Sequence, residues 1–324
     1  MISRRGCGLA AVVAVLFVGS LWAFFGGWYG SGPLEEDKHF VVPTGASLGD
    51  VADRLEKQGV IASASGFKLR ARVFGGGSGI KAGEFAIPAH ASPSAVLAII
   101  SSDEIIRRFV TIPEGMPSVM VYDRLKAQTA LTGDVAVPEE GSILPDTYNF
   151  ENGEAREELV RRMQAAMSRT LKELWANRAK GLVVKTPEQA IVLASIVEKE
   201  TGKPSERRMV AGLYSNRLRT GMLLQADPTI IYPITKGKRL GRRILQSEIQ
   251  AVNGYNTYTM VGLPKGPITN PSRESIAAVL NPAKTDALYM VADGTGGHAF
   301  AGTLAEHNRN VAKWFAIRRE RGEL

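Results

Sequence analysis

The segment LASIVEKET, residues 193–201, places two carboxylates, Glu198 and Glu200, in an otherwise apolar stretch. Side chains two positions apart in a helix point to different sides, so the two acids cannot share one task and one of them should be a surface residue. On a helical wheel that advances about 100° per residue, Glu200 falls among the largest apolar side chains, whereas Glu198 falls beside small residues. The pattern therefore predicts that Glu200 points toward the core or a cleft, and that Glu198 lies in milder surroundings.

A glutamate in apolar surroundings loses hydration, which raises its pKa. A raised pKa keeps the carboxyl group protonated near neutral pH, which is the state that a general acid needs. The alternative is a structural role, in which Glu200 pairs with an arginine such as Arg207 or Arg217, or caps a neighbouring element. Periodicity alone leaves both interpretations open.

Other catalytic chemistries find no support in the sequence. The four histidines lack the HExxH spacing or any other ligand spacing, so neither a metal nor another cofactor is expected. They are His39, His90, His298 and His307. No GxSxG or SxxK motif is present, and the single cysteine, Cys7, cannot form a disulfide within the chain.

Two predicted helices would position the acidic segment. The first has a well-formed start, with Thr186 as its N-cap and Pro187 as its first helical residue. The second begins near Ser205-Glu206 and carries Asn216 and Arg217 toward its end, where Gly221 stops it. The apolar stretch LLQADPTIIY (223–232) that follows favours a strand, on which Gln225 and Asp227 would lie.

A structured loop is expected at 254–272, because this stretch is dense in Gly, Pro, Asn, Thr and Tyr. Its aromatic and amide side chains offer the platforms and hydrogen bonds that sugars need, although each taken singly is also a common turn or packing residue. They are Tyr255, Asn256, Tyr258 and Asn270. Beyond this loop, LYMVADGTGGHAF (288–300) predicts two strands joined by a glycine-rich turn, and a closing helix starts near 303.

The N-terminus carries an uncharged run at 8–29, about 22 residues, which is long enough to cross a hydrocarbon core of ~30 Å at 1.5 Å per residue. Two arginines precede the run and three acidic residues follow it at 35–37. This asymmetry predicts a single-pass transmembrane helix with a cytoplasmic tail at 1–7 and the remaining chain outside the cytoplasm. A cleaved signal peptide is the alternative, but no convincing small-x-small cleavage site is present.

The remaining chain predicts an α+β protein in two parts after a short linker at 30–38. Residues 39–102 show the order strand–helix–helix–strand–helix in a small subdomain. Residues 103–324 form a larger mixed α/β domain with a long charged helix from 154 to 176.

The chain of 324 residues has a net charge of +8 and an isoelectric point near 9.6. Its basic residues are dispersed in short clusters without interleaved aromatic residues, so nucleic acid is not an expected partner. Attraction to an anionic polymer or membrane surface accounts for part of the excess charge.

Several motifs together resemble the MltG-type endolytic murein transglycosylases. They are LASIVEKET, SERRMVAGLYSNRLRTGMLLQADPTIIY, YNTYTMVGLPKGPITNP, LYMVADGTGGHAF and LAEHNRNV. The resemblance runs from about Phe40 to the C-terminus and is most specific between Leu193 and Asn308. It is looser at 40–102, where the family has a LysM-like subdomain, and Lys265 departs from the proline that many members carry.

The resemblance implies that Glu200, the second acid of the EKET motif, is the catalytic residue. It also implies a set of substrate-binding positions, which are Glu206, Asn216, Arg217, Gln225, Asp227, Tyr255, Asn256 and Asn270. The implied reaction is non-hydrolytic cleavage of the β-1,4 bond between N-acetylmuramic acid and N-acetylglucosamine in nascent glycan strands, which leaves 1,6-anhydro ends and ends strand growth. The implied partners are glycan strands and penicillin-binding protein synthases, and the implied location is the inner membrane.

A second interpretation from another functional class stays open. A non-catalytic peptidoglycan-binding scaffold would recruit cell-wall synthases and use the LysM-like part as its reader. A glutamate on an apolar helix face favours the enzyme, because a scaffold has no need for it.

Overall fold

The computed structural model describes residues 4–75 and 79–323, with only the backbone described for residues 4–12 and 23. The contacts of the chain divide it into a first unit, Met1–Arg108, and a second unit, Phe109–Leu324. Helices dominate both units, and the described strands form three two-stranded sheets, β1–β2, β3–β4 and β5–β6. This mixture of helices and small sheets confirms the predicted α+β class.

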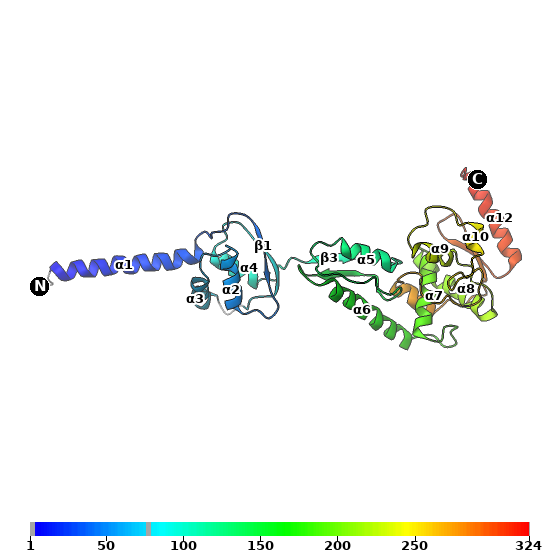
Figure 1. The fold of residues 1–324 in the computed structure, drawn as a ribbon, viewed down its shortest axis with the longest axis horizontal. Helices are drawn as coiled ribbons and strands as arrows, with labels where there is room; N and C mark the ends of the chain where they lie inside the picture. The colour runs from blue at the N-terminus through cyan, green and yellow to red at the C-terminus, as the bar shows by residue number, and fades with distance from the viewer. Residues whose placement is uncertain (1–3, 76–78, 324) are drawn as a thin grey trace. The chain divides into compact units, whose positions relative to one another are not determined.

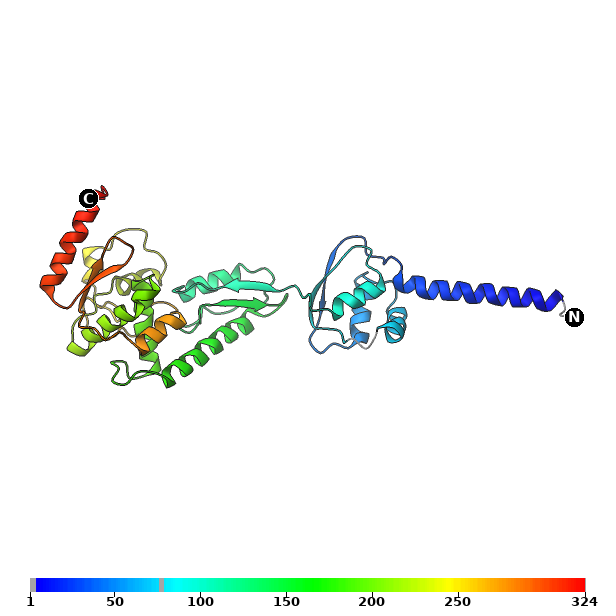
Figure 2. The same cartoon turned by 180° about the vertical axis from the view of Figure 1, so that it is seen from behind.

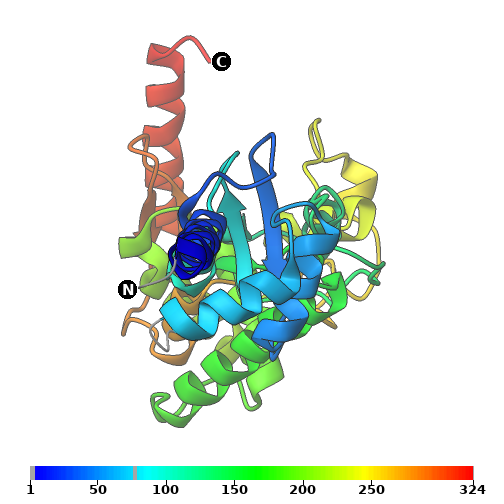
Figure 3. The ribbon, with the colours of Figure 1, turned by 90° about the vertical axis from the view of Figure 1, so that its left-hand side faces the viewer.

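The first unit follows the predicted order of strand, two helices, strand and helix after its N-terminal helix (Figure 1). Its elements are α1 (Arg4–Tyr29), β1 (Lys38–Val42), α2 (Leu48–Lys57), α3 (Ala64–Phe74), β2 (Gly83–Ile87) and α4 (Pro93–Ser101). The two strands are antiparallel, with Phe40 opposite Phe85 at the centre of the pair. Figure 3 shows these strands side by side with helices of the unit across them, and together they enclose one hydrophobic core. The likeness of this unit to LysM stays a prediction.

The C-terminal end of α1 packs onto the first unit. Trp28 is buried and lies against the rings of Phe67 and Phe74 on α3. The Arg70 side chain donates to the Phe24 carbonyl oxygen over 2.9 Å, which fixes the end of α1 to α3.

Among the described residues, no helix combines the length and the apolar character that crossing a membrane requires. The structure therefore does not confirm the transmembrane helix predicted at 8–29. The start of that run, and the cytoplasmic tail predicted at 1–7, lie partly or wholly outside the described side chains.

The second unit begins with a sheet that lies between two helices. Its first elements are β3 (Arg108–Thr111), α5 (Ser118–Lys126), β4 (Thr147–Phe150) and α6 (Arg156–Ala176). Figure 2 shows the β3–β4 pair with α5 on one side and α6 on the other. Val110 on β3, Val121 on α5 and Met163 on α6 meet in one buried cluster.

The remaining elements of the second unit include one buried helix, α7, at their centre. They are α7 (Pro187–Glu200), a 3-10 turn at Pro204–Glu206, α8 (Arg207–Thr220), α9 (Asp227–Thr235), α10 (Gln246–Ile249), α11 (Arg273–Leu280), β5 (Tyr289–Ala292), β6 (His298–Ala301) and α12 (Leu304–Glu320). Helices α6, α8, α9 and α11 all contact α7. The predicted cap is confirmed, because the Thr186 hydroxyl accepts from the Gln189 N–H over 3.2 Å. Every residue from Ala190 to Val197 is buried, so α7 is held rigidly up to its last turn.

The strand expected at 223–232 is wrong, because the structure has helix α9 there. Asp227 is its first residue and Pro228 follows, and both suit the first turn of a helix. The paired isoleucines favour a strand by propensity, but burial of Ile230, together with packing of Tyr232 in the core around α7, overrides that preference. The consequence is that Asp227 stands at a helix start rather than along a strand.

Candidate active site

A pocket of about 400 Å³ opens at the C-terminal end of α7. Glu200, the last residue of α7, lies in its wall. Helix α8, the start of α9, the loop at 254–272 and the β5–β6 hairpin supply the other walls. Their main contributions are Tyr214, Arg217, Gln225, Asp227, Tyr258, Met290 and His298.

Glu200 occupies an environment that favours its protonated form. Its Oε1 atom is buried and has no hydrogen-bond partner among the residues that the structure describes. Burial, followed by the negative charge of Asp227, raises the pKa of Glu200 to about 7, and a contact with the Tyr214 hydroxyl opposes this rise. The carboxyl group can therefore donate a proton near neutral pH and take one back afterwards.

Asp227 enters the pocket from the first turn of α9. Its Oδ1 atom accepts a hydrogen bond of 2.5 Å from the Tyr258 hydroxyl. Burial and this contact with Asp227 raise the pKa of Tyr258, so the phenol stays protonated and keeps donating. The acidic side chain is thus held in place beside Glu200, where its charge acts on the glutamate.

Arg217 supplies a buried positive charge near the two acids, but its hydrogen bonds go to the backbone. The guanidinium donates to the carbonyl oxygens of Leu288 over 2.7 Å and of Leu224 over 2.6 Å. Among described residues, Glu200 forms no ion pair with Arg217 or with Arg207, so the structural alternative based on such a pair is not observed. The positive charge of Arg217 lowers the pKa of Glu200 less than burial raises it.

Gln225 takes a backbone conformation that glutamine rarely adopts. Its φ is 51°, in the left-handed region. Its N–H donates to the Thr257 carbonyl oxygen over 3.1 Å, and the next residue is held by the Thr257 hydroxyl over 3.0 Å. Hydrogen bonds to Thr257 therefore hold the strained backbone of Gln225 in place. Residues with such a strained backbone are common at functional sites.

Glu206 lies behind the pocket and holds His298, which lines it. The Glu206 carboxylate accepts from the His298 N–H over 3.0 Å and contacts the ring Nδ1 over 2.8 Å. Burial alone would raise the pKa of Glu206, but these hydrogen bonds outweigh it and keep the pKa below its usual value. Glu206 therefore orients His298 at the edge of the β5–β6 hairpin.

The prediction that Glu198 occupies milder surroundings is wrong. Its side chain is only 5% exposed. Its Oε2 atom accepts from the Ser272 N–H over 2.8 Å and from the Ser272 hydroxyl over 2.6 Å. Ser272 is the N-cap of α11, so Glu198 fastens α11 to α7. The two acids do have different tasks, but Glu198 is a buried, structural residue and not a surface one.

Three predicted binding residues lie outside the lining of the pocket, and their amides hold backbone segments instead. Asn216 donates to the Thr285 carbonyl oxygen over 2.7 Å. Asn256 is fully buried and donates to the carbonyl oxygens at 249 and 251 over 2.9 and 2.7 Å. Asn270, also fully buried, accepts from the Ile143 N–H over 3.0 Å and donates to the Met116 carbonyl oxygen over 2.9 Å. Their role in substrate binding stays a prediction.

Tyr255 also lies outside this lining. Its ring packs on Tyr232, with 4.8 Å between the ring centroids, and the Lys265 ammonium lies 5.1 Å from its centroid. Lys265 thus contributes a cation over the tyrosine ring. Of the predicted set, the structure therefore brings together Glu200, Arg217, Gln225 and Asp227 in the pocket lining. Glu206 does not line the pocket but contacts His298, which does.

Sequence reasoning missed Tyr214, Lys199 and His298 as pocket residues. Tyr214 falls on the apolar face of α8 and reads as a core residue, although it precedes Arg217 by three positions and so shares its side of the helix. His298 follows a glycine-rich turn and has no spacing that would mark it. No group of three or more His, Cys, Asp or Glu residues in the described part of the chain could hold a metal ion.

This geometry suits acid–base chemistry on a neutral, hydrogen-bonding substrate. One carboxyl group is tuned to exchange a proton, and a second carboxylate, a phenol and an imidazole surround it in a pocket with a largely polar lining. The rigid α7 below and the fixed loops at its rim keep these groups in place without a ligand.

Comparisons with known proteins agree with the family to which the motifs pointed. The sequence pattern of the YceG-like family matches residues 40–313. An endolytic murein transglycosylase of Bacillus subtilis (strain 168) is 28% identical over 325 positions, covering 89% of this chain and 89% of that protein. An endolytic murein transglycosylase of Streptococcus pneumoniae serotype 2 is 37% identical over 181 positions, covering 54% of this chain and 32% of that protein.

A solved structure shares the fold. The crystal structure of a YceG-like protein from Listeria monocytogenes matches with a TM-score of 0.53 and 25% identity, covering 85% of this chain and 98% of that one. The match of the family pattern to most of the chain, together with these relatives, leads to one conclusion: the chain belongs to the YceG-like family.

Proposed function

We propose that this protein is an endolytic lytic transglycosylase, which cleaves the bond between N-acetylmuramic acid and N-acetylglucosamine within peptidoglycan strands. Two of its relatives carry the name endolytic murein transglycosylase. The observation that carries the proposal is Glu200 itself, a carboxyl group at the end of a rigid helix whose pKa is raised to about 7 in a polar pocket.

The reaction needs one group that acts first as an acid and then as a base. Protonated Glu200 donates its proton to the glycosidic oxygen, and the bond to C1 of the muramyl sugar breaks as positive charge develops at the ring. The Glu200 carboxylate then removes the proton from the C6 hydroxyl of the same sugar. The C6 oxygen bonds to C1 and closes a 1,6-anhydro ring, so no water is consumed and Glu200 is protonated again.

Asp227 has a supporting role in this proposal. Its negative charge raises the pKa of Glu200, which keeps the acid protonated. It also lines the same pocket, where its charge would stabilise the positive charge that develops on a bound sugar ring. A hydrolase would need this second carboxylate as a nucleophile or to activate water. The products decide between the two reactions.

Anchoring at the inner membrane is the second part of the proposal. Its support is the uncharged run at 8–29, flanked by arginines before it and acidic residues after it. Some side chains of this run lie outside the part that the structure describes. Floatation of the full-length protein with lipid vesicles, and its loss when residues 1–33 are removed, tests the anchor. With the catalytic unit outside the cytoplasm, the enzyme meets nascent strands and the penicillin-binding protein synthases, and its cuts end strand growth.

The experiment that tests the reaction incubates the protein with uncrosslinked peptidoglycan strands and identifies the new ends by mass spectrometry. 1,6-Anhydromuramyl ends are expected. Reducing ends would overturn the transglycosylase in favour of a hydrolase. Binding without cleavage would favour the peptidoglycan-binding scaffold.

A further inference from the structure

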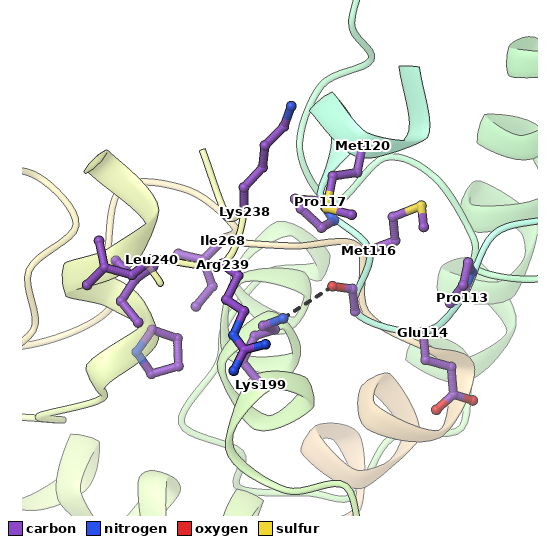
Figure 4. Close-up of a pocket in the computed structure, with 14 residues that line it drawn as sticks. Pro113, Glu114, Met116, Pro117, Met120, Lys199, Lys238, Arg239, Leu240 and Ile268 are labelled. Atoms are coloured by element: carbon purple, nitrogen blue, oxygen red, sulfur yellow. Dashed lines mark hydrogen bonds between the residues drawn. The ribbon is translucent and has the colours of Figure 1, made fainter. Parts of the chain in front are cut away.

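A second cavity, of about 530 Å³, borders the Glu200 pocket. The two share Lys199 and Pro228 as lining residues, so they are neighbouring cavities on the same face of the α7 end. Figure 4 shows this cavity between the start of α5 and the loop that follows α9. We call it the basic cavity, and the residues that the argument uses are Met116, Met120, Lys199, Lys238, Arg239 and Leu240.

The wall of the basic cavity is apolar and held in place. Met116 and Met120 line it from one side, and Leu240 lines it from the loop at 236–241 (Figure 4). Gly237 has a φ of +83°, and a Cβ added there would lie 2.7 Å from the Pro117 Cβ. The loop can therefore lie against Pro117 only because this residue is a glycine, and the contact fixes where the next two cations stand.

The rim of the basic cavity carries an excess of positive charge. Arg239 is exposed and forms no ion pair or hydrogen bond with any residue that the structure describes. Lys199 donates only to the Gly115 carbonyl oxygen, over 3.5 Å (Figure 4). Lys238 pairs with Asp123 over 2.8 Å. The acid at this rim, Glu114, is already paired with Arg207 on α8. Arg239 and Lys199 are thus available to bind an anionic ligand beside the apolar wall of the basic cavity.

We propose that the basic cavity binds the peptide substituent of the murein strand whose glycosidic bond lies at Glu200. The inference rests on the proposed function and goes beyond it, because it assigns a peptide-recognition site. Murein peptides are short, rich in alanine and carry free carboxylates, so their methyl groups match the methionine-lined wall and their carboxylates match Arg239 and Lys199.

The geometry is compatible with one strand occupying both sites. Lys199 and Glu200 are consecutive residues at the end of α7, and Lys199 lines both cavities. An extended peptide spans about 3.3–3.6 Å per residue, so four or five residues reach on the order of 15 Å from the sugar that bears them. The enzyme then distinguishes strands that carry peptides from strands that have lost them.

The test compares cleavage of uncrosslinked strands that carry peptides with cleavage of the same strands after enzymatic removal of the peptides. The measured quantity is the ratio of kcat/KM for the two substrates, with the full-length protein. A ratio well above one is expected for the natural sequence. Arg239→Glu should lower this ratio because the charge is reversed, and by only about tenfold because the position is exposed and screened by salt. Met120→Glu, on a different element, should lower it in the same direction.

Arg243→Glu is the matched control, because Arg243 is exposed on the chain segment just beyond the loop and lies outside the lining of the basic cavity. It changes the net charge equally and should leave the ratio unchanged. A ratio near one for the natural sequence, or a ratio that neither Arg239→Glu nor Met120→Glu lowers, overturns the peptide site alone. Failure of the natural sequence to cleave either substrate overturns the proposed function and the peptide site with it.

Discussion

Replacing Glu200 with glutamine should remove turnover and, at the same time, stabilise the protein above neutral pH. The folded structure raises the pKa of this carboxyl group from 4.5 to about 7. At 1.36 kcal/mol per pKa unit, the folded state prefers the protonated form by about 3 kcal/mol. Glutamine has nearly the same shape and cannot ionise, so the variant escapes this cost.

The sign of the effect follows from which state binds the proton. At pH 4 the carboxyl group is largely protonated in both the folded and the unfolded protein, so it costs little. Between about pH 4.5 and 7 the unfolded chain releases the proton while the folded protein keeps it, so the free energy of unfolding falls as pH rises. At pH 8 Glu200→Gln should therefore be more stable than the natural sequence by up to about 3 kcal/mol, and at pH 4 the two should be nearly equal.

The assay is urea unfolding of the full-length protein at pH 4, 6 and 8, together with detection of anhydro ends at pH 6. Glu188→Gln is the matched control, because Glu188 is exposed in the first turn of the same helix. Hydrogen bonds to its carboxylate from its own N–H and from Thr186 lower its pKa, so this variant should keep turnover and lose a little stability at pH 8. A stability difference for Glu200→Gln that is the same at pH 4 and pH 8, or retained turnover, would refute the reasoning.

Three further predictions follow from the same contacts. Asp227→Asn removes the charge that raises the pKa of Glu200, so the alkaline limb of the kcat/KM profile should move to lower pH; a limb that stays in place would contradict the assigned cause. Glu198→Gln weakens the contact with the cap of α11 and should lower the free energy of unfolding by about 1–2 kcal/mol while the anhydro product is still formed; loss of product in a folded variant would give Glu198 a chemical role. Gly237→Ala should cost about 1–2 kcal/mol, seen as a lower urea midpoint, and an unchanged midpoint would show that the loop can move away from α5.

The helix that carries the candidate acid could be predicted in detail from the sequence. The Thr-Pro start and the continuous small and branched apolar residues of α7 are local signals, and they place Glu200 on the side that meets the pocket. The order of elements in the first unit was equally predictable from local signals. Capping serines mark the starts of its helices, and short apolar stretches indicate its strands.

The partners of that helix could not be predicted. Glu198 is buried because α11, some 70 positions later in the chain, brings Ser272 against it, and a helical wheel contains no such information. The strand expected at 223–232 failed for a similar reason, since the helix-start residues Asp227 and Pro228 and tertiary burial outweighed the isoleucines. The first error arises from a contact between residues distant in the sequence, and the second also from a local helix-start signal that the isoleucines obscured.

The predicted roles of the asparagine side chains also depended on contacts that the sequence does not show. Asn256 and Asn270 fall in a loop whose composition suits sugar binding, yet both are fully buried and satisfied by backbone groups. A composition argument cannot separate residues that build a loop from residues that the loop presents. The cations of the basic cavity were equally hidden, because Lys199 and Arg239 are 40 positions apart and read as ordinary surface charges.

The position of Glu200 as the last residue of α7 bears on the second half of the reaction. The peptide dipoles of a helix leave partial negative charge at its C-terminal end, so an anion formed there is repelled by the helix itself. Once Glu200 has given up its proton, its conjugate base is more basic than an ordinary carboxylate, whose pKa is 4.5. Such a base readily takes up a proton, which in the proposed reaction comes from the C6 hydroxyl that closes the ring. The same placement that keeps the carboxyl group protonated before bond cleavage thereby makes its anion a stronger base in the step that follows.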